Sequence, residues 1–378
     1  MMTPVPRIDE AAEKTERRMN SSGTPSRGWG SVERVDIREH RKAITALFEK
    51  GGKADFARQF NWYYRSVGQE LPVSWILRDQ DQELRGLCSV TVRPMRFGVT
   101  TLRAGVAGNL MVDRKATNYL GAFLLVRAMK SLVTSHEIDV LLGIPNQLAQ
   151  PVFLRSGFHL MDRWDTYAQV FHSRNFLRSR AGLAASLASP FVDLGAAARR
   201  RVSRWSRPMF SGFLMVDLSE NEINNLALDE WSLPQSFVVN SSAEYLTWRF
   251  LRDPAKPAAI EAFVSPAGKT CAYVALRREP GRTWIIDCRV DHREWSETDA
   301  ILCFCRERQH LSDSVWVTSL HSGSLSEHLA SWGFVRVPHS MGGYPDYPLV
   351  GFWLPTHPLA HAFAQPSSWS LYPGFNDV

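Results

Sequence analysis

Two short passages of the chain recur at matched distances, which indicates an internal repeat. In the first half, Trp62 lies in Phe-Asn-Trp-Tyr-Tyr and precedes Gly157, which lies in Ser-Gly-Phe, by 95 residues. In the second half, Trp248 lies in Leu-Thr-Trp-Arg-Phe and precedes Gly333, which lies in Trp-Gly-Phe, by 85 residues. A fixed internal period constrains the fold strongly, because each copy must form one structural unit. The sequence therefore predicts two copies of a unit of roughly 130 residues.

The repeat divides the chain into five segments. We expect a first unit at 32–173, a connector at 174–212 and a second unit at 213–356. The tail at 1–31 is rich in charged and small polar residues, so we expect it to be disordered. It has no apolar stretch of the kind found in a secretory signal. An aromatic tail follows at 357–378. A chain of 378 residues is long enough for two or three domains.

Composition narrows the class of protein. Hydrophobic residues make up 44% of the chain, which excludes a mainly disordered protein. The five cysteines are odd in number and include no Cys-x-x-Cys pair, so neither a disulfide framework nor a zinc site is indicated. His321 and His328 have no third ligand beside them, and we predict no metal site. These features indicate a cytoplasmic protein.

The positive charge is concentrated in the connector. The formal net charge is +6, and the segment 176–210 carries seven arginines and one acid, Asp193. A nucleic-acid-binding protein is expected to spread positive charge over a folded face, so nucleic acid is an unlikely partner. Pro190 and Asp193 argue against a membrane span. A solvated linker is favoured, and a basic helix on an anionic membrane at the inner membrane face is the alternative.

Hydrophobic periodicity predicts the same order of elements in both units. The predicted helices are 37–50, 117–134, 147–155, 296–311 and 324–331. The predicted strands are 75–77, 87–92, 103–112, 139–144, 166–171, 272–276, 283–290, 315–320 and 349–354, the last closing the second unit. This order predicts an α/β (α+β) fold with a mixed sheet and helices on its faces.

Specific residues then resemble the GNAT superfamily of acyl-CoA-dependent acyltransferases. Ile144-Pro145-Asn146 stands before Phe153 and Gly157-Phe158, and Leu329 stands before Gly333-Phe334 in the second half. The paired tryptophan motifs resemble tandem GNAT proteins associated with bacterial surface-polysaccharide or cell-wall assembly. The resemblance covers about 30–355 and implies two fused GNAT-like units, each with a mostly antiparallel sheet and helices on both faces.

The resemblance implies that acyl-CoA places its pyrophosphate at the start of the long helix, where helix N–H groups are unpaired. The family motif is Arg/Gln-x-x-Gly-x-Gly/Ala, and this chain has Ala116-Thr-Asn-Tyr-Leu-Gly121, which keeps only the last glycine. The implied cofactor-binding residues are Met111, Val112, Arg114, Lys115, Thr117, Asn118, Tyr119, Leu120, Gly121, Ala122 and Asn146.

Charge favours the first copy as the cofactor site. Arg114 and Lys115 flank the first turn, and no acid enters it. In the second copy, Ser296 and Asp299 match a capping box, and Glu297 lies between them. Carboxylates beside a pyrophosphate are repulsive, so we expect the second copy not to bind CoA and to contribute to the acceptor site.

Catalytic residues are not fixed by the sequence. Many GNAT enzymes protonate the leaving thiolate with a tyrosine, where this chain has Phe153 and, in the second copy, Leu329. The candidates for a catalytic role are Asn109, Tyr119 and Asn146, with Tyr63 and Tyr64 as further acids. Packing is the favoured explanation for the aromatic residues Trp62, Tyr64, Trp248 and Phe250. For Asn146, capping of the next helix is an explanation equal to substrate binding.

The leading hypothesis is an N-acyltransferase. It moves an acyl group, on the simplest reading acetyl, from acetyl-CoA or another acyl-CoA to an amine of a sugar, an amino acid or a cell-wall precursor. One alternative is a non-catalytic partner in a polysaccharide assembly complex. Another is an aminoacyl-tRNA-dependent transferase, which the near-neutral folded units disfavour.

Overall fold

The fold is described from a computed structural model of the chain. It describes residues 31–53, 56–64, 70–174, 189–202, 213–226, 228, 231, 236–254, 257–343, 345 and 347–373. The predicted tail therefore lies outside the described residues, apart from Ser31. Among the described residues, no helix combines the length and apolar character needed to cross a membrane.

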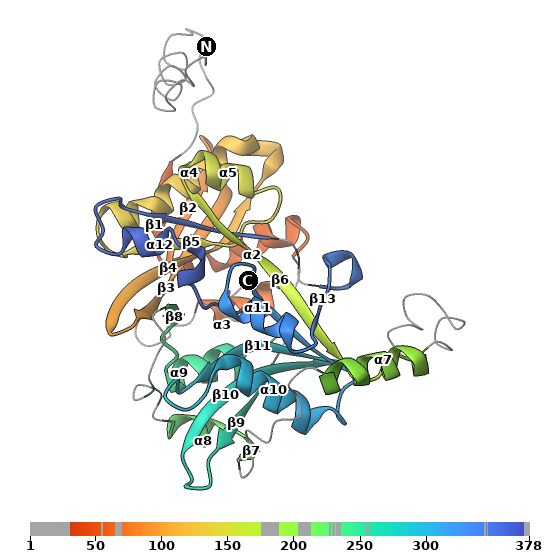
Figure 1. Ribbon diagram of the computed structural model, residues 1–378. Helices are drawn as coiled ribbons and strands as arrows, with labels where there is room; N and C mark the ends of the chain where they lie inside the picture. Colours follow the sequence, from red (N-terminus) through yellow and green to blue (C-terminus); the bar gives the residue numbers. More distant parts are fainter. Residues whose placement is uncertain are drawn as a thin grey trace, which may run out of the picture.

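The strands of the described residues form one connected sheet of 14 strands (Figure 1). Its main path runs β1-β2-β3-β4-β5-β14-β6-β12-β11-β10-β9-β7, with β8 paired to β3 and β13 paired to β6. The first part of the chain forms β1 (Val32–Val35), η1 (Ile37–His40), α2 (Arg41–Lys50), α3 (Phe56–Tyr63), β2 (Val73–Arg78), β3 (Leu84–Phe97), β4 (Thr100–Val112), α4 (Arg114–Thr134), β5 (Val140–Gly143), α5 (Gln150–Arg155) and β6 (His159–Val170).

The later part of the chain repeats much of this order. It forms α7 (Ser189–Val202), β7 (Leu214–Asp217), α8 (Glu220–Asn224), β8 (Phe237–Val239), α9 (Ala243–Leu246), the π-helical turn η4 (Thr247–Leu251), β9 (Ala259–Val264), β10 (Thr270–Glu279), β11 (Arg282–Val290), α10 (Glu297–Arg308), β12 (Ser314–Leu320), α11 (Ser324–Ser331), β13 (Val335–Arg336), η5 (His339–Met341), β14 (Pro348–Trp353), α12 (Ala360–Phe363) and η6 (Pro366–Ser368). The predicted α/β fold with a mixed, mostly antiparallel sheet is confirmed.

Helices cover both faces of the sheet, and successive residues of a strand pack alternately into the two apolar cores beneath them. In β2, Trp75 and Leu77 pack in the same cluster as Leu125 and Met129 of α4. The residue between them, Ile76, packs in the cluster formed by the aromatic residues of α2 and α3. This alternation is the period of two expected for a strand that is buried on both faces. In the second half, α10 and α11 cover one face in the same manner as α4 and α5.

Two strands exchange between the halves. The first residues of β6 pair with β14, and its last seven residues, Trp164–Val170, pair with β12 of the second half. Figure 1 shows β6 crossing diagonally from one half to the other. The strand predicted to close the second unit, 349–354, instead lies as β14 between β5 and β6, so that expectation was wrong. Sequence patterning defines that segment as a strand but does not specify its partners.

The two repeated tryptophans contact each other reciprocally. Nε1 of Trp62 donates to the carbonyl oxygen of Trp248 at 2.9 Å, and Nε1 of Trp248 donates to the carbonyl oxygen of Trp62 at 3.0 Å. Their rings stack with centroids 5.0 Å apart and planes 17° apart. A contact in which residue i meets j as j meets i is typical of a two-fold relation. Here it relates two passages of one chain.

The C-terminal tail and part of the connector also have defined places. Phe363, Trp369 and Tyr372 of the predicted aromatic tail are almost fully buried, so that segment completes the core of the molecule. Within the connector at 174–212, Arg174 and α7 are described. The arginines at 178, 180, 204 and 207 lie outside the described residues, and the side chains at 199–201 are not described.

Candidate functional site

The first candidate feature is the place where β4 and β5 stop pairing. The two parallel strands are in register from Ala104 with Val140 to Ala107 with Gly143. β5 ends there, while β4 continues to Val112 and pairs only with β3. In residues 108–112 of β4, the edge on the side of β5 therefore has no strand partner. Such an edge, at the carboxyl ends of parallel strands, is where open α/β sheets bind ligands.

A β-bulge shapes this edge. The register of β3 with β4 shifts between Leu87 and Ser89, and Asn109 of β4 has a φ of 52°. Nδ2 of Asn109 donates to the hydroxyl oxygen of Tyr64 at 3.1 Å, and that hydroxyl also contacts the hydroxyl of Ser89 at 3.1 Å. Burial raises the pKa of Tyr64 above its usual value. The side chain of Asn109 thus holds the bulge in place, and Tyr64 stays protonated inside the sheet.

The long helix α4 begins two residues after β4 ends, at the position predicted for the pyrophosphate. No acidic residue lies in its first turn. Leu120 is half-buried, and Gly121 and Ala122 are buried. The side chains of 114–119, which include the candidates Arg114, Lys115, Thr117, Asn118 and Tyr119, are not described. These candidates stay predictions from the sequence.

A buried carboxylate that the sequence analysis missed lies at the start of this helix. The backbone N–H of Asp113 donates to the carbonyl oxygen of Arg85 at 2.7 Å, and Nζ of Lys50 lies 2.5 Å from Oδ2 of Asp113. The Arg85 guanidinium lies 3.6 Å from the same oxygen. These two cations offset the negative charge of Asp113 at the end of the helix that would face an anion.

Asn146 follows β5 on the other side of the same opening. Its Oδ1 accepts from the backbone N–H of Leu148 at 3.1 Å and of Ala149 at 3.0 Å. These are the hydrogen bonds of a capped turn that leads into α5. The N-cap of α5 is Ala149 and has no side-chain cap, so the considered capping of that helix by Asn146 is not formed; the side chain of Asn146 is exposed. Phe153, which replaces the family tyrosine, stacks edge-on against Phe158 with centroids 4.9 Å apart and lies in the core.

The second half contains the corresponding feature. β11 and β12 pair in parallel from Arg282 with Ser314 to Ile285 with Val317, and β11 then continues to Val290 paired only with β10. Asp291 follows β11 as Asp113 follows β4, and the ammonium of Lys269 lies 3.1 Å from its Oδ2. The predicted capping box is confirmed, because Ser296 accepts from Asp299 and Asp299 from Ser296. In each half, therefore, one strand runs beyond its parallel partner and is followed by a carboxylate that pairs with a lysine.

In contrast to the first half, the unpaired edge of β11 is occupied by the chain itself. Glu297, the first residue of α10, has a side chain only 11% exposed and accepts hydrogen bonds from the hydroxyl of Ser370 at 3.1 and 3.2 Å. Arg289 of β11 lies 3.6 Å from Glu297, and its guanidinium lies over the ring of Tyr372 at 5.7 Å. Burial raises the pKa of the Glu297 carboxyl, against the opposing effect of Arg289. The C-terminal segment thus covers the helix start where an anion would bind.

A histidine–carboxylate pair lies where β12 meets β6. Nδ1 of His321 is 2.7 Å from Oδ2 of the buried Asp165, which also binds Arg336. The backbone N–H of Ser322 donates to Asp162 at 3.0 Å. The His321 side chain is 58% exposed, so its second ring nitrogen is open to solvent or a ligand. The sequence places these residues 156 positions apart, and no local pattern could have paired them.

Comparisons with known proteins bear on the fold. No family model and no curated protein matches the chain. A conserved protein of unknown function from Enterococcus faecalis V583, described as a probable N-acyltransferase, superposes with a TM-score of 0.61 at 12% identity, over 85% of this chain and 72% of that one. A GCN5-related N-acetyltransferase from Anabaena variabilis ATCC 29413 gives 0.59 at 9% identity, with the same coverage.

This chain has a GNAT fold. N-myristoyltransferase of Saccharomyces cerevisiae with bound myristoyl-CoA also matches, with a TM-score of 0.50 at 10% identity, over 88% of this chain and 80% of that one. The GNAT-fold neighbours thus match most of the chain, from both halves of the sheet. The resemblance predicted from the sequence is confirmed at the level of the fold.

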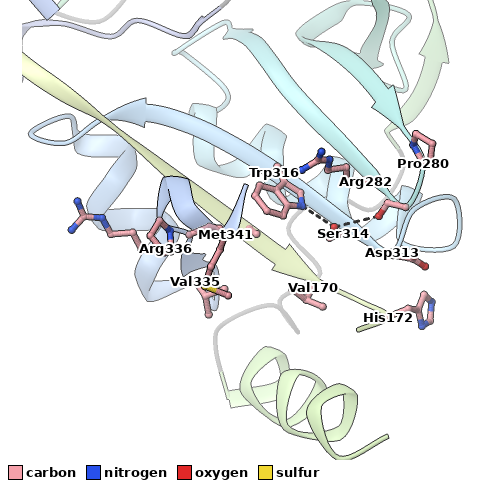
Figure 2. A pocket seen from close by; sticks show the side chains of 14 residues that line it. Val170, His172, Pro280, Arg282, Asp313, Ser314, Trp316, Val335, Arg336 and Met341 are labelled. Carbon is pink, nitrogen blue, oxygen red and sulfur yellow. Dashed lines mark hydrogen bonds between the residues drawn. The ribbon is translucent and has the colours of Figure 1, made fainter. Parts of the chain in front are cut away.

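Outside this region, a cavity of about 460 Å³ lies at the far end of the second half (Figure 2). It is lined by the last residues of β6, the first residues of β11 and β12, and the segment from β13 to η5. Its lining residue Arg336 also binds Asp165, so the cavity lies beside the histidine–carboxylate pair. It is not the site at the β4 edge.

Proposed function

We propose that the protein is an acyl-CoA-dependent N-acyltransferase whose cofactor binds in the first half. The observation that carries the proposal is the end of the β4–β5 ladder at Ala107 and Gly143, after which β4 continues without β5 to Val112 and α4 begins at Arg114. The unpaired edge offers backbone N–H and C=O groups to the amide-containing arm of acyl-CoA, as a strand edge does to a peptide. The helix start offers N–H groups to its pyrophosphate.

The choice of half rests on what fills each opening. In the second half, Glu297, Ser370 and Tyr372 meet at the strand edge, and two carboxylates lie in the first turn of α10. In the first half, no acid lies in the first turn of α4, and the carboxylate before it is neutralised by Lys50. A pyrophosphate is therefore repelled from the second site and accepted at the first.

We further propose two GNAT-like units, at 32–173 and 213–356, joined by the connector. The reciprocal contact of Trp62 with Trp248 and the shared order of strands support this division. The second unit then contributes to the acceptor site near the junction, where His321 and Asp165 could accept a proton from an amine. The acceptor would be an amine on a sugar, an amino acid or a cell-wall precursor. The protein would act in the cytoplasm. The basic connector would be either a solvated linker or a contact to the inner membrane face.

The proposal is tested by acetyl-CoA binding to a matched pair of variants. Lys50→Ala leaves Asp113 less neutralised beside the proposed pyrophosphate site, and Lys269→Ala does the same to Asp291 in the second half. Both lysine side chains are largely exposed, at 60% and 47%, so both variants should fold. We expect acetyl-CoA to raise the melting temperature of the wild type through binding linkage.

Lys50→Ala should weaken binding about fivefold, equivalent to about 1 kcal/mol, and Lys269→Ala should leave it unchanged. Gly121→Asp should abolish the shift in melting temperature, whereas Asp299→Ala should preserve it. A larger loss from Lys269→Ala than from Lys50→Ala would place the cofactor in the second half. No shift with acetyl-CoA or longer acyl-CoA would instead support a non-catalytic partner in an assembly complex.

A further inference from the structure

The cavity in Figure 2 has an apolar interior. Its walls include Val170 of β6, Trp316 of β12, and Val337, Pro338 and Met341 between β13 and η5. Trp316 packs with Ala168 and Val337 in a small cluster separate from the main cores. A volume of about 460 Å³ is within the range of small-molecule sites. The lining therefore favours a ligand with a substantial apolar part.

The polar groups on the Trp316 wall already have partners. Nε1 of Trp316 donates to the hydroxyl oxygen of Ser314 at 2.7 Å, and that hydroxyl donates to the carbonyl oxygen of Gly281 at 3.3 Å. Figure 2 shows both bonds running along the wall. Hydrogen bonds that are satisfied within the protein leave a ligand little to gain from a polar group at this depth. The Trp316 ring is only 3% exposed and packs against Trp284, so the accessible apolar lining comes mainly from Val335 and Met341, which are 38% and 44% exposed.

The charged residues around the cavity do not select one sign of charge. Arg336 is held by Asp165 on β6, and Arg282 is paired with Glu279 at 2.6 Å. Arg282 also lies over the Trp316 ring at 5.4 Å. Asp313 lines the same cavity with its negative charge. Since each cation named here has a carboxylate partner, recognition should depend on the apolar part of a ligand rather than on its head group.

A second apolar surface lies beside the cavity. The backbone N–H of Ser173, next to the cavity-lining His172, donates to Asp193 of α7 at 2.7 Å. This contact fixes the start of α7 near the cavity, as Figures 1 and 2 both show. On α7, Phe191 is 78% exposed and Leu194 is 69% exposed. These two residues expose apolar surface on the helix that Asp193 attaches to the end of β6.

We infer that this cavity binds the alkyl chain of an amphiphile, separately from the proposed cofactor site. The source of the chain is either a free fatty acid or a membrane lipid. In both cases the chain occupies the space between Trp316, Val170 and Met341, and the head group stays at the surface. The inference does not depend on the proposed acyltransfer.

Calorimetric titration of the full chain with octanoate, nonanoate and decanoate, below their micelle concentrations, tests the inference. Each added methylene should lower the Kd about fourfold until the cavity is filled. Decyltrimethylammonium should bind within about threefold of a carboxylate of equal chain length, since the head group is not selected. A Kd that does not change with chain length would overturn the inference.

Cavity-filling variants locate the site. Val170→Phe should weaken decanoate binding at least tenfold, and Val335→Phe, at a residue 38% exposed, gives a second filling variant at the surface. Val99→Phe is the matched control, because Val99 is 94% exposed at the distant turn between β3 and β4. Equal effects of the three variants would overturn the assignment.

Flotation with phosphatidylglycerol vesicles distinguishes the two sources. Loss of flotation in Val170→Phe, together with loss of decanoate binding, would indicate a membrane lipid. Flotation that is unchanged while decanoate binding is lost would indicate a free fatty acid. Vesicle binding without any binding of free chains would contradict a site in this cavity.

Discussion

The reciprocal tryptophan contact gives a quantitative test of how the two halves are joined. Each ring donates one hydrogen bond to the backbone of the other, and the two rings share one stack. Trp62→Phe and Trp248→Phe each remove one hydrogen bond, which contributes about 1 kcal/mol. Each also weakens the stack, which contributes about 1 kcal/mol. We therefore expect each single variant to lower the free energy of unfolding by about 2 kcal/mol.

The double variant separates the shared contribution. Because the stack is counted in both single variants, the pair should lose about 3 kcal/mol rather than about 4, which gives a coupling of about 1 kcal/mol. Urea unfolding followed by circular dichroism measures all four free energies, provided each shows one cooperative transition. The Arg93 guanidinium lies 4.7 Å from the centre of the Trp248 ring and also 4.9 Å from that of Tyr245, which neither substitution changes.

Trp332→Phe is the control for this cycle. Trp332 is partly buried in the second half and packs against a different core from Trp62. Its effect should add to that of Trp62→Phe within about 0.5 kcal/mol. A coupling between Trp62 and Trp248 no larger than this control value would refute the reasoning that their contact joins the halves.

Two further predictions concern titratable groups. Burial, followed by the nearby Arg289, lowers the pKa of His292 from its usual value, so the unfolded chain takes up this proton first as the pH falls. Stability should therefore be lost as the pH falls below the ordinary histidine value of 6.5, and His292→Gln should lose less, as thermal melting at several pH values can show. Burial also raises the pKa of the cysteine thiols, to about 11 for Cys271 and about 12 for Cys303. All five cysteines are buried, so a thiol reagent should modify none in the folded protein and all five after unfolding; rapid modification of the folded protein would contradict the structure.

The sequence predicted features that depend on local conformation. Gly157 and Gly333 were matched as equivalent residues, and both follow short helices with φ of 83° and 90°. That conformation favours glycine, so the signal lies in the residue type itself. The capping box of Ser296 and Asp299 was also predictable, because its two partners are three residues apart.

Features that depend on distant partners were not predictable. The exchange of β14 into the first half involves pairing with β5, about 200 positions earlier, and an alternating strand pattern does not encode its neighbour. Lys50 and Asp113 are 63 positions apart, and Ser370 reaches Glu297 across 73. The bulge at Asn109 also escaped prediction, because a non-glycine residue at positive φ has no sequence signal of its own.

The central claim is that one acyl-CoA binds per chain, at the start of α4. Calorimetric titration with acetyl-CoA measures this directly, because it gives the number of sites together with their affinity. We predict one site per chain, weakened in Lys50→Ala and unchanged in Lys269→Ala. Two sites per chain, or a single site that is weakened only by Lys269→Ala, would contradict the account.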